Sequence, residues 1–595
     1  MIKVLPVYPK FPPSFWSYRY AIDLIGKKAI MPPLGLITVC AMLPRDKFES
    51  MPVADLNVRD LRDEEIKEAD IVFASSMVTQ KDSLKEVVDR AHFFGKKVVA
   101  GGPYPTSYHG NVPGDFFVLG EAEVTLKPFL EDLIKNCAGK VYDEKIYSKR
   151  IPSETLTKGG KPLLTQTPIP RWDLLNPSAY ASGAVQFSRG CRFNCEFCYV
   201  RELNGGEPRA KTPEQMIREM ETIRTNGWSG SVMIVDDNIL LDTIALRKTI
   251  PLLTSWQKDH GFPYTFSTQA SLDLSSNENK DILNGMVKAG FDSVFLGVES
   301  FDPAVLKKMH KAQNSSGMGL LEKIEVVQRA GLDTLIGAIL GADGENPKAS
   351  EQMFESIQKA GVVISMVGKL NALPDTKLYA RLKKEERLLD EVVGDNVHSS
   401  GFNFVTQSGN DYLNDRHSEL QKKLFESKNY YDRCRILGSR RGQHHSDDRF
   451  NLGGLVAAGK LLYENSVQFD YEFFKYISEV TLKNPWELGE AFAQAAKLRH
   501  FKKMTEHSLE VVKFTKSTET LYASFQARMS ELSGDARRKI SEFEAAEKEI
   551  MRKAEKSYEK LHEDFRQSAK TALNNLDRKI REYKDQYILS QSSLF

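Results

Sequence analysis

A regular alternation of strand-like and helix-like segments between residues 185 and 373 constrains the fold more than any other feature of the chain. Short apolar runs alternate there with amphipathic segments that are long enough for helices. Six such steps with short connections predict an open or partial (β/α)6 barrel, with reactive groups at the carboxyl ends of its strands. Strands are expected at 185–190, 231–238, 265–274, 293–300, 333–341 and 362–373, and helices at 212–227, 243–259, 279–290, 316–330 and 347–360.

A second alternation, in residues 1–135, predicts an α/β domain with a doubly wound, Rossmann-like parallel sheet. Two glycine-containing turns, Gly101-Gly102 and Gly120-Glu121, directly follow two of its strands. Open parallel sheets bind ligands at these carboxyl ends, and glycine lets the backbone approach a ligand closely. From the glycines alone, ordinary tight turns are the favoured interpretation.

The remaining boundaries come from changes in composition and periodicity. Prolines without clear periodicity mark a linker at 141–180, between an N-terminal domain at 1–140 and the barrel at 181–385. A helical C-terminal domain is expected at 386–515. Apolar residues then recur every eleven positions from 516 to 595, which predicts a long, coiled-coil-like helix that packs or self-associates along one face. This repeat consists of Leu521, Leu532, Phe543, Ala554, Phe565, Leu576 and Tyr587.

Composition excludes several classes of protein. A chain of 595 residues is too long for a single core. The formal net charge of +2, with 27% charged residues, gives no basic excess for binding nucleic acid. The six cysteines are not spaced as a secreted disulfide framework, and no apolar stretch has the roughly 18 residues needed to span a membrane. The N-terminal MIKVLPVYPKFPP lacks the apolar core of a signal peptide, so we expect a cytoplasmic protein.

Three cysteines, Cys191, Cys195 and Cys198, lie close together directly after the first barrel strand. Their C-x3-C-x2-C spacing brings three soft, anionic thiolates onto one small cluster, as iron-sulfur chemistry requires. In a [4Fe-4S] cluster the fourth iron would stay open and could bind the amino and carboxylate groups of S-adenosylmethionine (SAM). Structural zinc is the alternative, but it normally needs four protein ligands and no fourth ligand is close in sequence.

Polar residues occupy the predicted carboxyl ends of later strands. Asp236-Asp237-Asn238 ends the second strand, Gln269 lies in the third and Glu299 ends the fourth. Such groups face a barrel mouth, where carboxylates can accept hydrogen bonds from the SAM ammonium and ribose hydroxyls. Phe197, between the second and third cysteines, could place its ring against adenine. Taken singly, these residues are more often helix caps, turn residues and packing aromatics.

Several segments resemble a known family. CRFNCEFC is similar to the signature of radical SAM enzymes, and IVDDN, STQASLDL, LGVES followed by LKKMHKAQN, and LNALPDTKLYARLKKEERL are similar to its cobalamin-binding subgroup. Within that subgroup the chain most resembles proteins of the hopanoid-methylase type, over residues 1 to 510. The resemblance implies that the three cysteines ligate the cluster and that the SAM site is built from Phe197, Asp236, Asp237, Asn238, Gln269 and Glu299.

The first domain carries a separate part of the resemblance. Its PPLGL, SSMVTQ, GGPYPT and LGEAEVT are similar to the cobalamin-binding module of these enzymes. The resemblance therefore implies a cobalamin site that includes Ser76, Gly101, Gly102, Gly120 and Glu121. No D-x-H-x-x-G motif occurs, so a bound cobalamin is expected to be base-off without a lower histidine ligand.

A histidine pair, a tyrosine pair and a single histidine lie outside these motifs, and each has a structural interpretation. His444-His445 could suggest a second metal, but the polar surroundings favour a solvated loop. Tyr430-Tyr431 could line a substrate cavity, and helix packing is the simpler interpretation. His109 is expected in a surface loop.

The leading hypothesis is a cobalamin-dependent radical SAM methyltransferase that acts on an unactivated carbon of a small molecule or lipid. The resemblance suggests a lipid such as a polycyclic terpenoid, an electron donor such as flavodoxin or ferredoxin, and a peripheral membrane contact. A radical SAM cyclase, rearrangement or oxidative enzyme without methyl transfer is the second hypothesis. An iron-sulfur sensor or scaffold that assembles through the C-terminal helix is the third.

Overall fold

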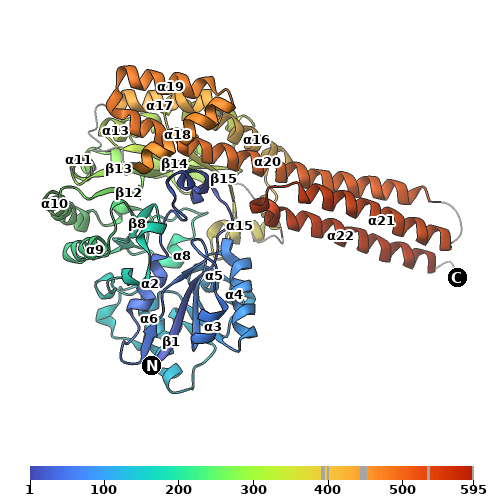
Figure 1. Ribbon diagram of the computed structural model, residues 1–595, viewed down its shortest axis with the longest axis horizontal. Helices are drawn as coiled ribbons and strands as arrows, with labels where there is room; N and C mark the ends of the chain where they lie inside the picture. The colour runs from blue at the N-terminus through green and yellow to red at the C-terminus, as the bar shows by residue number, and fades with distance from the viewer. Residues whose placement is uncertain (390–395, 398–400, 442–451, 533–535, 593–595) are drawn as a thin grey trace. The chain divides into compact units, whose positions relative to one another are not determined.

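A computed structural model describes residues 1–389, 396–397, 401–441, 452–532 and 536–592 (Figure 1). The chain divides into two compact units. The first contains Met1–Phe11 and Trp16–His500, and the second contains Pro12–Phe15 and Phe501–Phe595. His444 and His445 lie outside the described residues.

The N-terminal sheet has the strand order β2-β1-β4-β5-β6-β7, with β3 also paired to β1, and every pair is parallel. Apolar strand residues are buried on both faces of this sheet, in two clusters covered by helices. The predicted doubly wound α/β domain is therefore confirmed. Its strands are β1 (Ile2–Tyr8), β2 (Phe48–Ser50), β3 (Ala54–Asp55), β4 (Ile71–Ser75), β5 (Lys97–Gly101), β6 (Phe116–Leu119) and β7 (Val141–Asp143), and its main helices are α2 (Leu34–Ala41), α3 (Asp63–Glu68), α4 (Lys81–Phe93), α5 (Pro103–Tyr108) and α6 (Ala122–Ile134).

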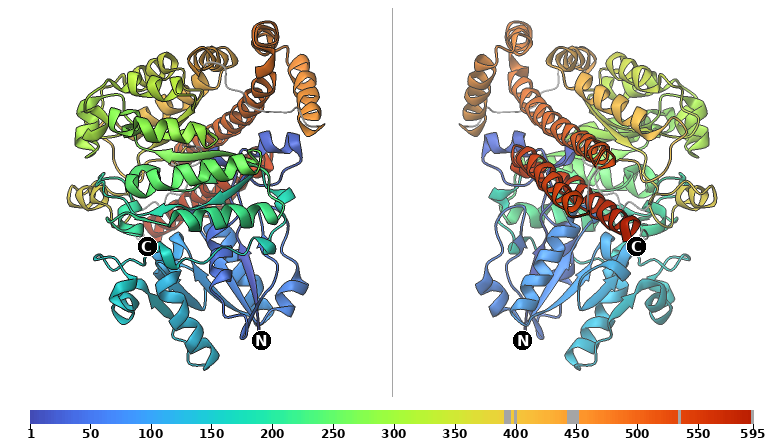
Figure 2. Two further views of the ribbon diagram at one scale, coloured as in Figure 1. Left: turned by 90° about the vertical axis from the view of Figure 1, so that its left-hand side faces the viewer. Right: turned by 90° about the vertical axis from the view of Figure 1, so that its right-hand side faces the viewer.

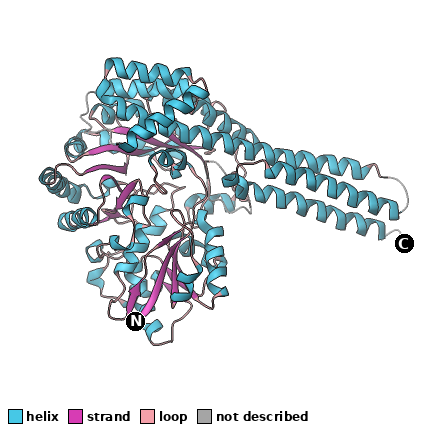
Figure 3. Ribbon diagram, viewed as in Figure 1, coloured by secondary structure: helices cyan, strands magenta, loops and turns pink. Residues whose placement is uncertain are grey.

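The second sheet is the predicted six-stranded partial barrel. Its strands follow chain order, β8-β11-β12-β13-β14-β15, all pairs are parallel, and its two edge strands, β8 and β15, are not paired with each other. Figure 3 draws the strands of both sheets in magenta. The strands are β8 (Ser182–Val185), β11 (Gly230–Ile234), β12 (Tyr264–Ala270), β13 (Phe291–Glu299), β14 (Asp333–Leu340) and β15 (Ile364–Lys369). The helices between them are α9 (Pro213–Thr225), α10 (Thr243–Asp259), α11 (Lys280–Lys288), α12 (Pro303–Lys308), α13 (Leu320–Arg329) and α14 (Ala349–Ala360).

The first barrel strand differs from its predicted range, 185–190. It begins at Ser182 and ends at Val185, because the Phe187 amide donates to the Asp236 carboxylate instead of continuing the sheet. A two-residue strand, β9 (Ser188–Arg189), then pairs antiparallel with β10 (Arg209–Ala210). This small ribbon frames the cysteine loop.

The chain after the barrel is helical, as predicted. Tyr430 and Tyr431 are fully buried in α17 (Ser427–Arg441), which confirms that they pack between helices. His109 lies exposed in a short helical turn. The helices of the first unit are α15 (Lys377–Lys384), α16 (Asn410–Leu424), α17 (Ser427–Arg441), α18 (Leu452–Val467), α19 (Tyr471–Lys483) and the first part of α20 (Leu488–Ser530).

The eleven-residue repeat is not one continuous helix. It is divided between the end of α20, α21 (Ala536–Glu559) and α22 (Glu563–Ser592), and α21 and α22 lie side by side (Figures 1 and 2). An apolar stripe is buried when the chain folds back on itself, and Phe543, Ala554 and Leu576 from the repeat share one core with Phe525. The prediction of a single helix was wrong, although the region does end in a long helix, α22.

Among the described helices, none combines the length and apolar character needed to cross a membrane.

Candidate functional site

The cysteine loop lies beyond the carboxyl end of β8, between β9 and α8 (Val200–Asn204). The Cys191 amide donates to the Gly205 carbonyl (3.0 Å), which closes the loop at its two ends. The Cys198 amide donates to the Cys195 carbonyl (3.3 Å), so these two residues form a tight turn. All three cysteines are free and partly exposed.

Burial raises the pKa of the thiols of Cys191, Cys195 and Cys198, that of Cys198 to about 12. Their mutual charges raise the pKa values of Cys191 and Cys198 further, which indicates that the thiols are neighbours. Without a metal the thiols are therefore protonated at neutral pH, and thiolate ligation must release protons. No set of three or more His, Cys, Asp and Glu side chains within the described ranges is already gathered as a metal site. The three thiols are soft donors, and a set of three fits a [4Fe-4S] cluster with one open iron.

Glu196, between the second and third cysteines, anchors this loop to α15. Its carboxylate accepts from the Arg381 guanidinium (3.0 and 3.2 Å), and its carbonyl accepts from the Leu378 amide (2.8 Å). Arg381 also donates to Asp343 (2.7 Å), which follows β14. Glu196 is buried and fully engaged, so it fixes the loop and does not serve as a fourth ligand.

Glu299 and Lys311 form an ion pair at the carboxyl end of β13. Both side chains are only 12% exposed, and Glu299 has a φ of 65°, a conformation that non-glycine residues rarely adopt. Burial alone would lower the pKa of Lys311, but the charges of Glu299 and Cys195 raise it. Lys311 therefore places a buried cation beside the cysteine loop. Sequence reasoning did not single out this lysine, although LKKMHKAQN carries it.

Asp236 and Asn238 serve mainly to hold the loops together. One Asp236 oxygen accepts from the Phe187 amide (2.7 Å) and the other from the Ser188 hydroxyl. The Asn238 side-chain oxygen accepts from two backbone amides, and Asn238 is buried. Burial raises the pKa of Asp236 to about 7. Asp237 is exposed and accepts from the Asn204 side chain (3.1 Å).

The other predicted SAM residues are placed differently. Gln269 is half-buried near the carboxyl end of β12 and lines a large cavity inside the barrel. Phe197 is half-buried in the cysteine loop. A contact of either residue with SAM stays a prediction, as do the contacts of Asp236, Asp237, Asn238 and Glu299.

A cavity of about 290 Å³ lies at the carboxyl ends of β4, β5 and β6. It is lined by Gly101, Gly102, Gly120 and Glu121 from the N-terminal sheet, together with residues of the barrel. Gly102 (φ 90°) and Gly120 (φ 81°) adopt backbone conformations that favour glycine. An added Cβ would lie 2.8 Å from the Ser75 hydroxyl at Gly102 and would collide with the Glu144 side chain at Gly120. Ser76 is buried beside this wall without lining it, and its hydroxyl has no hydrogen-bond partner.

Glu121 links the N-terminal sheet to the cysteine loop. Its carboxylate accepts from Arg189 (2.7 Å) and Arg209 (2.8 and 2.9 Å), and all three side chains are buried or nearly so. Arg189, which also pairs with Glu123 (3.0 Å), lies two residues before Cys191. Sequence reasoning missed both arginines, because nothing in their local pattern shows that they meet a carboxylate of another domain.

Comparison with known proteins shows the family to which this chain belongs. Residues 185–357 match the radical SAM superfamily, and residues 376–513 match a domain of unknown function (DUF4070). The chain is 34% identical to an uncharacterized methyltransferase of Synechocystis sp., over 84% of this chain and 91% of that one. It is also 33% identical to the hopanoid C-2 methylase of Rhodopseudomonas palustris, over 65% of this chain and 71% of that one. The chain belongs to the radical SAM methyltransferases of the hopanoid-methylase type.

This radical SAM enzyme therefore uses SAM and a [4Fe-4S] cluster, as the cysteine spacing predicted. The predictions of its family, fold and enzymatic nature are confirmed. Among solved structures it is similar to the radical SAM methyltransferase TsrM of Kitasatospora setae (14% identity, TM-score 0.49, 65% of this chain and 76% of that one). It is also similar to the cobalamin-dependent radical enzyme OxsB (14% identity, TM-score 0.46, 98% and 84%). Both likenesses are too distant to assign a ligand.

Proposed function

We propose that this enzyme is a cobalamin-dependent radical SAM methyltransferase that methylates an unactivated carbon of a lipid. The observation that carries this proposal is the cavity of about 290 Å³ at the carboxyl ends of β4, β5 and β6. Its wall combines both glycine turns of the N-terminal sheet with Gln186 and Arg189 of the barrel. A ligand held there lies next to the strand that leads into the cysteine loop. The similarity to a hopanoid methylase supports a lipid substrate.

The residues around this cavity fit the part of a base-off cobalamin that would reach into the N-terminal sheet, because the whole cofactor is larger than the cavity. Parallel sheets bind ligands at this edge, and Gly101, Gly102 and Gly120 leave backbone that a flat cofactor can approach closely. No histidine lines the cavity among the described residues. When bound, cobalamin supplies a carrier that accepts and donates methyl groups. Arg189 and Glu121 hold its cavity against the barrel.

The cysteine loop supplies the second half of the proposed site. Cys191, Cys195 and Cys198 would hold the cluster, which when bound supplies the electron that cleaves SAM. A small electron-transfer protein such as flavodoxin or ferredoxin would reduce it. Tyr199, directly after Cys198, accepts a hydrogen bond from the Ser107 hydroxyl of α5 (2.9 Å). This contact joins the N-terminal domain to the end of the cysteine loop. Close packing of the two would help to exclude water from a reactive radical.

The test measures which cofactors the anaerobically reconstituted enzyme binds and which products it forms from SAM. We expect four irons and one cobalamin per chain, and both 5′-deoxyadenosine and S-adenosylhomocysteine as products. Cys195→Ala should abolish deoxyadenosine formation, whereas Cys137→Ala, an exposed cysteine outside the loop, should not change it. Deoxyadenosine without S-adenosylhomocysteine would contradict methyl transfer and favour a cyclase, rearrangement or oxidative enzyme. Continued SAM cleavage by Cys195→Ala would contradict the cluster assignment.

A further inference from the structure

The partial barrel is open along one side, because its edge strands β8 and β15 are not paired with each other. The cysteine loop follows β8 and α15 follows β15, so both segments leave the barrel at the carboxyl ends of the edge strands. The two segments contact each other through Glu196. They thereby join the two edges that the sheet leaves apart.

Glu196 is held at its backbone and at its side chain. Its amide donates to the Met309 carbonyl just after α12 (3.2 Å), and its carbonyl accepts from the Leu378 amide (2.8 Å). Leu378 lies in the first turn of α15, where backbone amides have no partner within the helix. One turn further along α15, Arg381 donates to the two oxygens of the Glu196 carboxylate from Nε (3.2 Å) and Nη2 (3.0 Å). Two parallel bonds from one planar guanidinium fix both the distance and the direction of this carboxylate.

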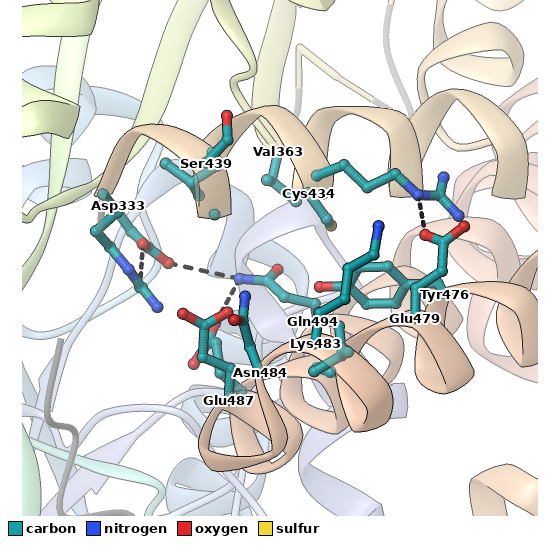
Figure 4. A pocket seen from close by; sticks show the side chains of 17 residues that line it. Asp333, Val363, Cys434, Ser439, Tyr476, Glu479, Lys483, Asn484, Glu487 and Gln494 are labelled. Atoms are coloured by element: carbon teal, nitrogen blue, oxygen red, sulfur yellow. Dashed lines mark hydrogen bonds and ion pairs between the residues drawn. The ribbon is translucent and has the colours of Figure 1, made fainter. Parts of the chain in front are cut away.

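Arg381 is itself anchored to β14. It donates to Asp343 (2.7 Å), which follows this strand, and Arg387 donates to both oxygens of the same carboxylate (2.7 and 3.0 Å). β14 is also held at its amino end, where Asp333 pairs with Arg441 of α17 (Figure 4). Arg381 therefore ties the cysteine loop to a strand that is fixed at both ends.

The charges of this network are unequally shared. Among the described residues, Arg381 is the only cation that pairs with Glu196. Asp343 and Glu385 also pair with Arg381, but each of them has a second pair, with Arg387. Loss of Arg381 would therefore leave one carboxylate in particular without a counter-charge. That carboxylate, Glu196, is only 10% exposed and lies within the cysteine loop.

An uncompensated negative charge beside an iron-sulfur cluster opposes its reduction, because reduction adds an electron. Net charge, hydrogen bonds and solvent exposure around a cluster are among the properties that set its reduction potential. Water and salt screen a buried carboxylate only weakly, so its charge acts at full strength on its neighbours. A cation that pairs with Glu196 therefore makes a cluster in this loop easier to reduce.

We propose that Arg381 is a positioning residue for the cluster. It holds the cysteine loop in place through Glu196, and its charge prevents that carboxylate from lowering the reduction potential. This role rests on the proposed function only in that Cys191, Cys195 and Cys198 hold the cluster. It requires neither cobalamin nor methyl transfer.

The reduction potential is measured on the full-length, anaerobically reconstituted enzyme without SAM or cobalamin, by electron paramagnetic resonance at a series of poised potentials. In Arg381→Met we expect roughly threefold fewer reduced clusters at the midpoint potential of the parent. Arg381→Lys keeps the charge and should stay close to the parent. Arg387→Met is the matched control, because Arg387 belongs to the same network without an ion pair to Glu196 among the described residues. An unchanged potential in Arg381→Met, or an equal shift in Arg387→Met, would overturn the proposal.

A double variant separates charge compensation from a general loss of structure. Glu196→Gln combined with Arg381→Met removes both charges, so its potential should return close to that of the parent although the ion pair is still absent. A merely structural role of the pair predicts that the double variant shifts at least as far as Arg381→Met. That outcome would overturn the charge compensation.

Hydrogen exchange of the full-length protein tests the positioning role. Peptides that cover residues 191–205 should exchange faster in Arg381→Met. They should also exchange faster in Arg381→Lys, because lysine cannot form the two parallel bonds. Arg387→Met leaves the Arg381–Glu196 pair intact and should exchange as the parent does in this loop. Exchange at the parent rate in Arg381→Met would overturn the positioning role.

Failure of this proposal and failure of the proposed function give different results. A reconstituted parent without the signal of a [4Fe-4S] cluster would contradict the proposed function and this role with it. A normal cluster signal whose potential does not respond to Arg381 would overturn the role of the arginine alone.

Discussion

Asp236, a buried carboxyl group just after β11, should make the stability of the folded protein depend on pH. Burial raises its pKa from 3.8 to about 7, so the folded protein holds the proton more tightly than the unfolded chain does. The contribution of Asp236 to stability is therefore fully present below about pH 4 and is lost as the pH rises towards 7. The side chain of the Asp236→Asn variant does not ionise, so the stability of this variant does not fall with pH for this reason.

The quantity to follow is the difference in free energy of unfolding between the parent and Asp236→Asn. We expect this difference (parent minus variant) to fall by roughly 2–4 kcal/mol between pH 4.5 and 7.5. Urea unfolding of the barrel at each pH measures this difference. Asp281→Asn is the control: the Asp281 pKa is lowered by its hydrogen bond with Arg247, so no such fall occurs over this range. A pH-independent difference for Asp236→Asn would show that Asp236 ionises normally in the folded protein.

At the scale of elements, the short strand β9 connects the N-terminal sheet to the cysteine loop. Arg189 of β9 pairs with Glu121 and Glu123, which lie at the start of α6, and all three side chains are at most 15% exposed. Removing Arg189 would leave the buried Glu123 carboxylate without this counter-charge, which costs about 3–5 kcal/mol, whereas Glu121 keeps its pair with Arg209. Arg189 therefore holds the start of α6 at the edge of the proposed cobalamin cavity.

Arg189→Met should lower the amount of cobalamin that copurifies with the enzyme at least fivefold while the iron content stays at the parent level. The reason is that Arg189 both lines the cavity and holds its two walls together, whereas the cysteines are unchanged. Arg224→Met removes an exposed pair on α9, which contributes at most about 1 kcal/mol, and should change neither quantity. Unchanged cobalamin in Arg189→Met would exclude this role for the arginine.

For the whole molecule, the sequence predicted the architecture because both sheets are built from repeated local patterns. Buried strands such as Phe116–Leu119 are short apolar runs, and the helices that cover them have one apolar face. The eleven-residue repeat also marked the buried stripe of the C-terminal helices. It could not show where the chain folds back, because a stripe that packs within one chain and a stripe that packs against another chain look the same.

The candidate site was predictable only in part. Cysteine spacing is a local signal, and it indicated the radical SAM family, which the family match confirms. That the three cysteines hold the cluster stays a prediction. The Arg189–Glu121 and Lys311–Glu299 pairs depend on which loops meet in space, so no spacing rule finds them. Four serines line the large cavity inside the barrel, each from a separate strand, and each one alone is an ordinary polar residue. Only their register across four strands shows that they line one space.

The second unit should be able to lose its packing without loss of radical chemistry. Phe543 is buried in the core of this unit and makes an edge contact with Phe525 (5.1 Å between ring centroids). Phe543→Ala should cost about 3–5 kcal/mol, as large-to-small core substitutions do, and should speed hydrogen exchange in α21 and α22. Ile540→Ala, at a 45% exposed position of α21, should change exchange far less. Because the first unit has its own cores, its exchange and the formation of 5′-deoxyadenosine should stay at the parent level in both variants. Faster exchange throughout the barrel of Phe543→Ala would mean that the two units unfold together.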